Sequence, residues 1–428
     1  MTEQAAESED MREISSNSHA QAHVRPGDEL DEFRTTVRAW CTEHIPADWR
    51  RAQTGVSDGE FVRFQKAWFA ELHSAGYAVP HWPREWGGGL RTRGAARKMS
   101  VAEQVVLYQE LAAHDAPRLV LAFVSIHHAA STLLVAGTDE QRRRHLPAIL
   151  DGEIWVQGFS EPEAGSDLAS LRTSARRVGD SYIVNGQKLW ASGGKHADWC
   201  LLLARTDPDA PKRKGISYFL LDMTTPGVEV RPIRNAIGDS HFCEIFLNDV
   251  SIPAANLVGA ENAGWQVAQA TLGAERGLTM LELAERLGNA GFRWLVQACR
   301  SDDPVVADRL AQFEIEITGL RGLCRKMVES DDIESKGVAG TAGPADASIV
   351  KLYYSELLQR LTDFGAEVGG LKAHTELAKP MSSGWESGSW VLDFIGSWEW
   401  TIPGGSSEIQ RTIIAERGLG LPREPSVA

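Results

Sequence analysis

A run of small and hydroxyl-bearing residues is the first part of the chain whose composition could hold a ligand. Its sequence is Gly158-Phe-Ser-Glu-Pro-Glu-Ala-Gly-Ser-Asp167, and it contains the hydroxyl groups of Ser160 and Ser166. In a turn rich in small residues, backbone N–H groups and hydroxyls can converge on one planar ligand that carries many acceptor atoms. Residue types alone are also typical of a Ser/Gly/Pro loop between domains, which is the simpler interpretation of this run.

Two other positions could take part in chemistry. Trp190 could stack on a planar ring, although a tryptophan taken alone is more typical of a protein core. Glu275 stands directly before Arg276. Gly273 and Gly277 flank this pair and leave space for a ligand, at a helix-propensity cost of about 1 kcal/mol each. Taken alone, Glu275 is more typical of a solvated helix carboxylate.

Composition excludes several classes of protein. A chain of 428 residues is too long for one compact core, so two or three domains are expected. The net charge of -14 argues against non-specific binding to nucleic acid or anionic lipid. Five scattered cysteines without a CxxC pair indicate neither a disulfide framework nor a zinc site. Polar residues interrupt the apolar run Leu119–Gly137, which favours a buried helix over a membrane span. A soluble, cytoplasmic protein is predicted.

The elements that must position these residues follow the order α, β, α. Helical spacing of apolar residues begins near Asp31, and Thr138-Asp139 predicts a cap ahead of a helix over Glu140–Leu150. Asn185-Gly186 lies between two strand-like runs and predicts a hairpin turn. Long helices with short links return after Asn262 and favour a bundle. The other predicted strands are Trp199–Ala204, Ile216–Leu221, Val228–Ile233 and His241–Leu247.

The predicted fold class is α+β. A Gly-rich connection is expected over Asp331–Pro344, within the second helical region. The predicted domains are a disordered tail over 1–27, an N-terminal α-helical domain over 28–154, a middle antiparallel β domain over 155–262 and a C-terminal α-helical bundle over 263–428.

Four motifs in this order resemble the signatures of the acyl-CoA dehydrogenase family. The loop over 158–167 resembles the first signature, in which Ser-Glu-Pro, a variable pair and Gly-Ser-Asp follow one another. Asn185–Ser192 resembles the Asn-Gly-Gln-Lys-x-Trp-x-Thr/Ser strand, Phe242–Pro253 the last β strand, and Ser406–Arg411 the C-terminal signature. The resemblance covers roughly residues 30 to 425, and the α-β-α order is also the architecture of that family.

The resemblance implies FAD as the cofactor. The turn at Phe159 and Ser160, together with Ser166, would bind the isoalloxazine edge. Trp190 would lie against the flavin, and the hydroxyl of Ser192 would reach N5, the atom that receives the hydride. The full set of implied FAD contacts is Gln157, Phe159, Ser160, Ser166, Trp190, Ser192 and Ser406.

The resemblance also implies the reaction, in which an acyl-CoA thioester becomes its trans-2-enoyl-CoA. Removal of the weakly acidic α proton requires a positioned carboxylate. In many members that carboxylate directly precedes the C-terminal signature, where this chain has Gly404. Other members place a glutamate before an arginine on the first helix after the β domain, so Glu275 is implied as the base. Ser166, Arg276 and the backbone N–H of Gly404 are the implied substrate contacts.

Two departures from the family pattern predict a partner subunit. An arginine that reaches the FAD pyrophosphate of a neighbouring subunit is missing, because Cys299 lies near that position and Asp302-Asp303 follow it. A family glutamine is also missing from Ala366-Glu-Val-Gly-Gly370. The chain is therefore expected to be the base-bearing subunit of an α2β2 enzyme, in which a second acyl-CoA dehydrogenase-like subunit supplies both side chains. The resemblance further implies a bulky CoA thioester of the steroid side-chain type and an electron-transfer flavoprotein as acceptor.

Three alternatives stay open at this point. The chain could be a flavin oxidase or monooxygenase of the same fold, or a non-catalytic subunit that only holds FAD. It could also be a homotetramer with altered FAD contacts. Sequence does not define the acyl group, because the shape of a pocket between helices decides chain-length and ring specificity.

Overall fold

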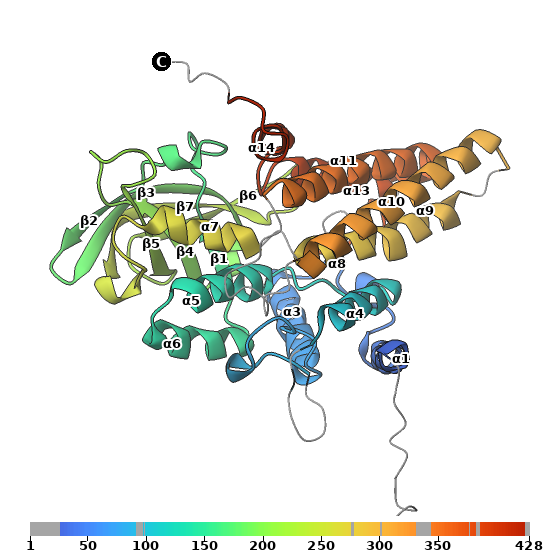
Figure 1. The fold of residues 1–428 in the computed structure, drawn as a ribbon, viewed down its shortest axis with the longest axis horizontal. Helices are drawn as coiled ribbons and strands as arrows, with labels where there is room; N and C mark the ends of the chain where they lie inside the picture. The colour runs from blue at the N-terminus through green and yellow to red at the C-terminus, as the bar shows by residue number, and fades with distance from the viewer. Residues whose placement is uncertain are drawn as a thin grey trace, which may run out of the picture.

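The β-sheet and the long helices α10 and α11 occupy opposite ends of the molecule, and shorter helices lie along the side between them (Figure 1). The order α, β, α and the α+β class predicted from sequence are both confirmed. The computed structural model describes residues 26–90, 97, 99–274, 278–299, 302–330, 344–375, 377–381 and 386–423.

Capping boxes start three of the N-terminal helices. Ser57, Ser100 and Thr138 each accept a hydrogen bond from the backbone N–H three residues later, and the side chain at that position bonds back. The cap predicted at Thr138 is confirmed. The predicted helix in the run Leu119–Gly137 is a π-helical turn, η2 (Val124–Ala129), that continues into α5. The helices are α1 Pro26–His44, α2 Trp49–Ala52, α3 Asp58–Ser74, α4 Val101–Ala113, α5 Ala130–Ala136 and α6 Asp139–Leu150.

The middle region forms one sheet with the strand order β6-β7-β3-β2-β4-β5-β8. Most neighbours are antiparallel, but β1 and β2 run parallel to β4, and β1 continues the sheet directly after the first helical region. Alternate residues of the long strands are buried, as expected for a sheet with one covered face. The strands are β1 Trp155–Gly158, β2 Ser174–Val178, β3 Ser181–Ser192, β4 Trp199–Arg205, β5 Ile216–Asp222, β6 Val228–Ile233, β7 Phe242–Pro253 and β8 Leu257–Val258.

The hairpin predicted at Asn185-Gly186 is wrong. The two residues lie inside β3, where its register with β7 shifts, and the tight turn is instead at Gly179, between β2 and β3. Asn185 hydrogen-bonds the backbone N–H and a carboxylate oxygen of Asp249 across this bulge. Glycine is required at 186 because a Cβ there would lie 2.5 Å from Oγ1 of Thr173. Close approach of two segments, rather than a turn, therefore explains this dipeptide.

Helices joined by short turns make up most of the described C-terminal region. The sequence analysis did not predict α12, α13 or the 3-10 turn η8, which bring the chain from α11 to the C-terminal signature. The predicted Gly-rich connection over 331–344 lies almost wholly outside the described residues. The elements are α7 Gly264–Ala274, α8 Leu278–Arg286, η6 Leu287–Phe292, α9 Arg293–Ala298, α10 Pro304–Ser330, α11 Pro344–Val368, α12 Gly370–Thr375, α13 Trp390–Ser397, η8 Trp398–Thr401, α14 Ser407–Ile413 and η9 Ile414–Gly418.

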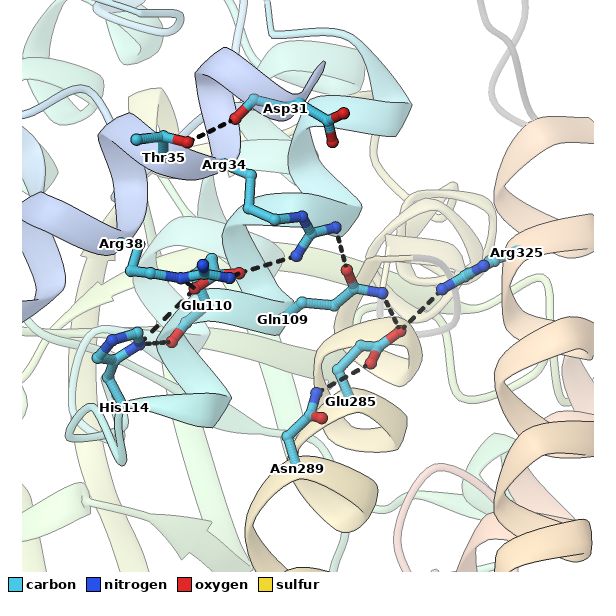
Figure 2. A network of polar contacts seen from close by, with 10 residues as sticks. All are labelled: Asp31, Arg34, Thr35, Arg38, Gln109, Glu110, His114, Glu285, Asn289 and Arg325. Carbon is cyan, nitrogen blue, oxygen red and sulfur yellow. Dashed lines mark hydrogen bonds and ion pairs between the residues drawn. The ribbon is translucent and has the colours of Figure 1, made fainter. Parts of the chain in front are cut away.

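A network of polar side chains joins the first and last helical regions (Figure 2). Glu285 of α8 is 1% exposed, and its carboxylate accepts hydrogen bonds from Gln109 of α4 and from Asn289. It also forms ion pairs with two arginines of α10, Arg321 and Arg325. One buried carboxylate thus ties α4, α8 and α10 together.

The predicted disorder of residues 1–27 falls mostly outside the described residues, and Pro26 and Gly27 belong to α1. None of the helices in the described part of the chain combines the length and the apolar content that crossing a bilayer requires. The five cysteines are free thiols. Among the described residues, no three His, Cys, Asp or Glu side chains come together as a metal site would need.

Candidate functional site

The loop that follows β1 is tied to β3 near its start. Within the loop, Glu161 and Ala164 form a small two-way backbone bridge of 3.1 Å in each direction. The backbone N–H of Leu189 in β3 donates to the carbonyl of Ser160 at 2.9 Å. Phe159 is buried, and its ring meets the edge of Tyr218 at 5.8 Å between centroids. The structure therefore brings Phe159 and Ser160 beside the strand that carries Trp190 and Ser192.

Trp190 has an unusual backbone and an exposed ring. Its φ is 65°, an uncommon value for a bulky residue, and the pairing of β3 with β7 shifts register between Lys188 and Ala191. The indole is 55% exposed and is supported on one side by an edge contact with Phe242 at 5.8 Å. A bulge that turns a large aromatic ring out of a sheet provides a stacking surface for a planar ligand.

Ser192 ends β3 beside this bulge. It pairs with Phe242 of β7 and is half-buried. Directly after it, Gly193 adopts a φ of 76° and donates its N–H to the carbonyl of His241 at 2.8 Å. The hydroxyl of Ser192 is thus held at the same strand end as Trp190.

The end of β1 carries a buried donor that lacks an acceptor. Nε2 of Gln157 is buried and has no hydrogen-bond partner within the structure. Such a group costs about 1–3 kcal/mol unless a ligand satisfies it. The neighbouring Gly158 leaves the strands close together, because a Cβ there would lie 2.7 Å from Sγ of Cys200. An exposed aromatic surface, a half-buried hydroxyl and an orphaned amide donor fit an acceptor-rich planar cofactor such as FAD.

Ser166 lies apart from this group of residues. It is exposed further along the loop, next to Asp167, whose carboxylate binds Nζ of Lys212 at 2.8 Å. Among the described residues, no recorded contact joins Ser166 to β3. Its predicted role in flavin or substrate binding remains a prediction.

The C-terminal signature forms a rigid turn before α14. Nε2 of Gln410 donates to the carbonyls of Gly404 and Gly405, at 2.7 and 3.2 Å. Both glycines have positive φ values, 66° and 97°. Ser406 is the N-cap of α14, and its hydroxyl accepts from the N–H of Ile409 at 3.4 Å. In the part of the chain that the structure describes, Ser406 and Gly404 bond only to the C-terminal region, and no hydrogen bond joins them to β3.

Glu275 and Arg276 lie outside the described residues, so their roles remain predictions. The described helix α7 ends at Ala274, directly before them in the sequence. Within α7, the hydroxyl of Thr271 binds Oγ1 of Thr132 at 2.6 Å and the phenol oxygen of Tyr218 at 3.1 Å. All three side chains are buried. Since the ring of Tyr218 also contacts Phe159, the last turn of α7 is linked to the predicted flavin loop.

A group of titratable residues that sequence reasoning missed lies near Gly193. Burial lowers the pKa of His241 to about 4, and burial raises the pKa of Glu399 to about 7. The charges of Arg118 and Asp239 act on both residues. Nothing in the local sequence of Glu399 indicated burial, and the charged residues that act on it, Arg118 and Asp239, are far away in the sequence.

The three regions of the chain match three family models. Residues 27–153 match the acyl-CoA dehydrogenase N-terminal domain. Residues 157–250 match the acyl-CoA dehydrogenase middle domain, and residues 262–419 match the acyl-CoA dehydrogenase C-terminal domain. Together the matches extend over most of the chain.

Characterised relatives and solved structures agree with these matches. Acyl-CoA dehydrogenase IpdE1 of Mycolicibacterium smegmatis is 37% identical over 413 residues, which cover 92% of this chain and 99% of that protein. The Tcur3481-Tcur3483 steroid ACAD superposes with a TM-score of 0.78 at 30% identity, over 94% of this chain and all of the other. The ChsE4-ChsE5 complex of Mycobacterium tuberculosis gives a TM-score of 0.73 at 29% identity, over 93% and 98% of the two chains.

Proposed function

The chain belongs to the acyl-CoA dehydrogenase family, and on that premise we propose that it converts an acyl-CoA thioester to its trans-2-enoyl-CoA with Glu275 as the base. It is an oxidoreductase that acts on a CH–CH group and uses FAD. When bound, FAD supplies the acceptor for the β hydride. Proton removal, orientation of the thioester and exclusion of water are left to the residues of this chain.

One observation carries this proposal. The hydrogen bond from Leu189 to Ser160 joins the two segments that the family signatures assign to the flavin, although the segments are far apart in sequence. Ser160 would bind the edge of the isoalloxazine, and Trp190 would cover one side of it. The orphaned donor of Gln157 would bind an oxygen atom of the cofactor. Desolvation by the indole would strengthen the remaining polar contacts.

Glu275 would take the α proton. Its place in the sequence, four residues after Thr271, supports this role, because Thr271 is bonded to Tyr218 and Tyr218 packs on Phe159. A general base must lie within hydrogen-bond reach of the proton that it removes. Arg276, the next residue in the sequence, would support the substrate or the flavin.

Gly404 would hold the thioester carbonyl. Gln410 fixes the carbonyl groups of Gly404 and Gly405, so the orientation of this turn is set before any ligand arrives. A backbone N–H fixed in this way stabilises the enolate oxygen that develops as the α proton leaves. Ser166 would contact the substrate at the exposed part of the loop.

The enzyme would be an α2β2 assembly in which a second acyl-CoA dehydrogenase-like subunit completes each FAD site. Near the position where the family pattern has an arginine this chain has Cys299, and at the position of the family glutamine it has Ala366. Asp302 and Asp303 are exposed, and their charges would repel a diphosphate. Two of the similar solved structures are named as pairs of proteins, which supports the same arrangement.

The substrate would be a bulky CoA thioester of the steroid side-chain type, with an electron-transfer flavoprotein as the acceptor. The name of the Tcur3481-Tcur3483 structure, a steroid ACAD, supports this class of substrate. Purified enzyme assayed with steroid side-chain CoA thioesters and with straight-chain acyl-CoA thioesters tests it. A higher kcat/KM for straight chains would contradict the steroid assignment.

Cofactor content tests the assembly. The chain is expressed alone and together with the product of its genomic neighbour, and bound FAD is measured per subunit. We expect stoichiometric FAD only after co-expression, because this chain lacks the trans contacts. Full FAD occupancy and full activity from the chain alone would contradict the α2β2 proposal.

Substitution of the base tests the reaction. Glu275→Gln should lower kcat for an acyl-CoA with a dye acceptor under anaerobic conditions by about 10²–10⁴-fold while FAD content stays unchanged. The exposed carboxylate of Glu314 in α10 provides the matched control, and Glu314→Gln should retain activity. Normal turnover by Glu275→Gln would instead favour a subunit that only holds FAD. Turnover that requires oxygen would favour an oxidase or monooxygenase.

A further inference from the structure

Lys188 is a fully buried lysine in strand β3 of the middle region. Its side chain is 0% exposed, on β3, two residues before Trp190. Transfer of an ammonium group from water to a protein interior costs several kcal/mol unless a partner compensates it. A lysine at such a position therefore has a specific partner that fixes its place.

The partner of Lys188 is the loop that follows β1. Its Nζ donates to the carbonyl of Phe159 at 3.2 Å and to Oε1 of Glu161 at 2.7 Å. Glu161 is itself only 9% exposed. Two consecutive parts of the loop, a backbone carbonyl and a carboxylate, are thus held by one cation from the neighbouring strand.

Glu161 also holds the far end of the same loop. Its carboxylate accepts hydrogen bonds from the backbone N–H groups of Arg172 at 2.6 Å and Thr173 at 2.9 Å. Burial raises the pKa of Glu161, but Lys188 and these donors outweigh burial and leave the pKa below its ordinary value. The carboxylate is therefore ionised at neutral pH, and it closes the loop from residue 161 to residue 173.

The loop after β1 would form one wall of the flavin site, and the residues of β3 that follow Lys188 would form the other. Directly after Lys188, the N–H of Leu189 binds the carbonyl of Ser160. The register of β3 against β7 then shifts, and Trp190 turns outward with its positive φ. Lys188 thus lies at the junction between the loop with Ser160 and the bulge with Trp190.

We propose that the buried ion pair between Lys188 and Glu161 is the positioning element of the flavin site, which holds the loop and the bulge of β3 at the separation that an isoalloxazine ring requires. The inference rests on the proposed function, because the ring is the ligand that the two walls would hold. Lys188 and Glu161 act through Ser160 and Trp190, so they are positioning residues rather than catalytic ones.

The competing explanation is that the pair only stabilises the fold. Removal of one partner leaves an unpaired buried charge and destabilises a protein whatever the role of the pair. Removal of both charges avoids this, and a buried pair can often be replaced by neutral side chains without loss of stability. The double variant therefore separates positioning of the flavin site from stabilisation of the fold.

The experiment compares Lys188→Met, Glu161→Gln and the double variant, each as the full chain in whichever preparation of the wild type retains FAD. Affinity is measured by quenching of FAD fluorescence on titration of flavin-free protein, and unfolding by urea is measured on the same samples. We expect both single variants to unfold at lower urea. The double variant should regain most of the stability and still bind FAD about tenfold or more weakly than the wild type, with a broadened visible flavin spectrum.

Glu110→Gln is the control for loss of a buried carboxylate elsewhere, because Glu110 is 3% exposed and is bound by Arg34 and Arg38 in the N-terminal helices. It should lower stability without a change in FAD affinity or spectrum. Wild-type FAD affinity and an unchanged spectrum in the double variant would overturn the positioning role alone. Failure of the wild type to bind FAD in either preparation would overturn the proposed function itself. If Lys188→Met does not fold, Glu161→Gln, which keeps one acceptor oxygen, decides by the same measurements.

Discussion

Trp190 combines a strained backbone with an exposed ring, and neither property benefits the flavin-free chain. A non-glycine residue at φ 65° costs on the order of 1–3 kcal/mol and persists only where the surroundings enforce it. An indole that is 55% exposed contributes little burial in return. Both features become useful when a flat ligand covers the ring.

Trp190→Ala should therefore affect cofactor binding more than stability. We expect FAD to bind about tenfold or more weakly, because one stacked aromatic surface is lost. The free energy of unfolding of the flavin-free chain should change by less than about 1 kcal/mol. Flavin fluorescence titration and urea unfolding measure the two effects. Ile315→Ala, at an exposed position of α10, is the control that should change neither, and a large loss of stability in Trp190→Ala would identify a core residue instead.

At this scale the sequence predicted residues that carry a motif but not the residues that support them. Ser160 and Trp190 were predicted from signatures, and the structure brings their segments together. Lys188 and Glu161 stood in the same signatures, yet nothing local revealed that they form a buried pair. Burial depends on segments distant in sequence, so it could not be predicted from the order of residues alone.

Among the elements, α7 is held to the sheet by a buried polar contact as well as by apolar packing. Thr271 binds both Thr132 of α5 and Tyr218 of β5. Thr271→Val would leave Thr132 and Tyr218 with weaker partners, because their own separation is 3.4 Å. We expect a loss of about 1–2 kcal/mol of stability by urea unfolding.

The control for Thr271→Val is Thr412→Val in α14. Thr412 is exposed, and its hydroxyl binds only the carbonyl of Glu408 in its own helix. Its replacement should change stability by less than about 0.5 kcal/mol. Equal effects of the two substitutions would contradict an anchoring role for Thr271.

The start of α13 predicts a dependence of stability on pH. Burial raises the pKa of Asp393 to about 8, although the N–H of Ser387 donates to its carboxylate and Arg50 opposes the shift. The folded state therefore retains a proton that the unfolded chain releases near pH 4. The stability from this proton is fully present below about pH 4 and is lost as the pH rises through about 8.

Asp393→Asn should remove this dependence, since an amide keeps the acceptor for Ser387 and carries no charge. We expect the variant to gain stability relative to the wild type between about pH 5 and about pH 9. Urea midpoints across that range measure the difference. Asp308→Asn, at an exposed carboxylate, corrects for the change in net charge. A constant difference between Asp393→Asn and the wild type would show that Asp393 is ionised throughout.

Element types were easier to predict than turn positions. Strands β4, β5 and β6 and helix α6 were predicted within a few residues, because apolar runs and a capping signal mark where they begin and end. The turn was misplaced at Asn185-Gly186, where a dipeptide typical of hairpins serves a bulge and a close approach to Thr173. Glycine at such a position satisfies either requirement, so the sequence could not distinguish them.

For the whole molecule, the network around Glu285 should decide how firmly the two helical regions hold together. Glu285→Gln removes the charge that faces Arg321 and Arg325. It also weakens the contact with Gln109, which Figure 2 shows beside the ion pair with Arg325. We expect a loss of about 2 kcal/mol, below the usual value for a fully buried pair because both arginines are partly exposed. Hydrogen exchange should quicken in α4 and α10 together.

The matched control is Glu316→Gln, which removes the more exposed ion pair between α10 and Arg360 of α11. It should cost less than about 1 kcal/mol and leave exchange in α4 unchanged. Quicker exchange in α10 alone after Glu285→Gln would contradict a link between the two helical regions.

The order of strands leaves some strand edges unpaired while the chain is being synthesised. β3 ends at Ser192, but its long neighbour β7 begins only at Phe242, and β8 closes the edge of β5 at Val258. A chain still on the ribosome before that point presents unpaired strand edges to other nascent chains. We therefore expect fragments that end within this interval to aggregate more readily than the full chain, because β7 and β8 are missing from their sheets.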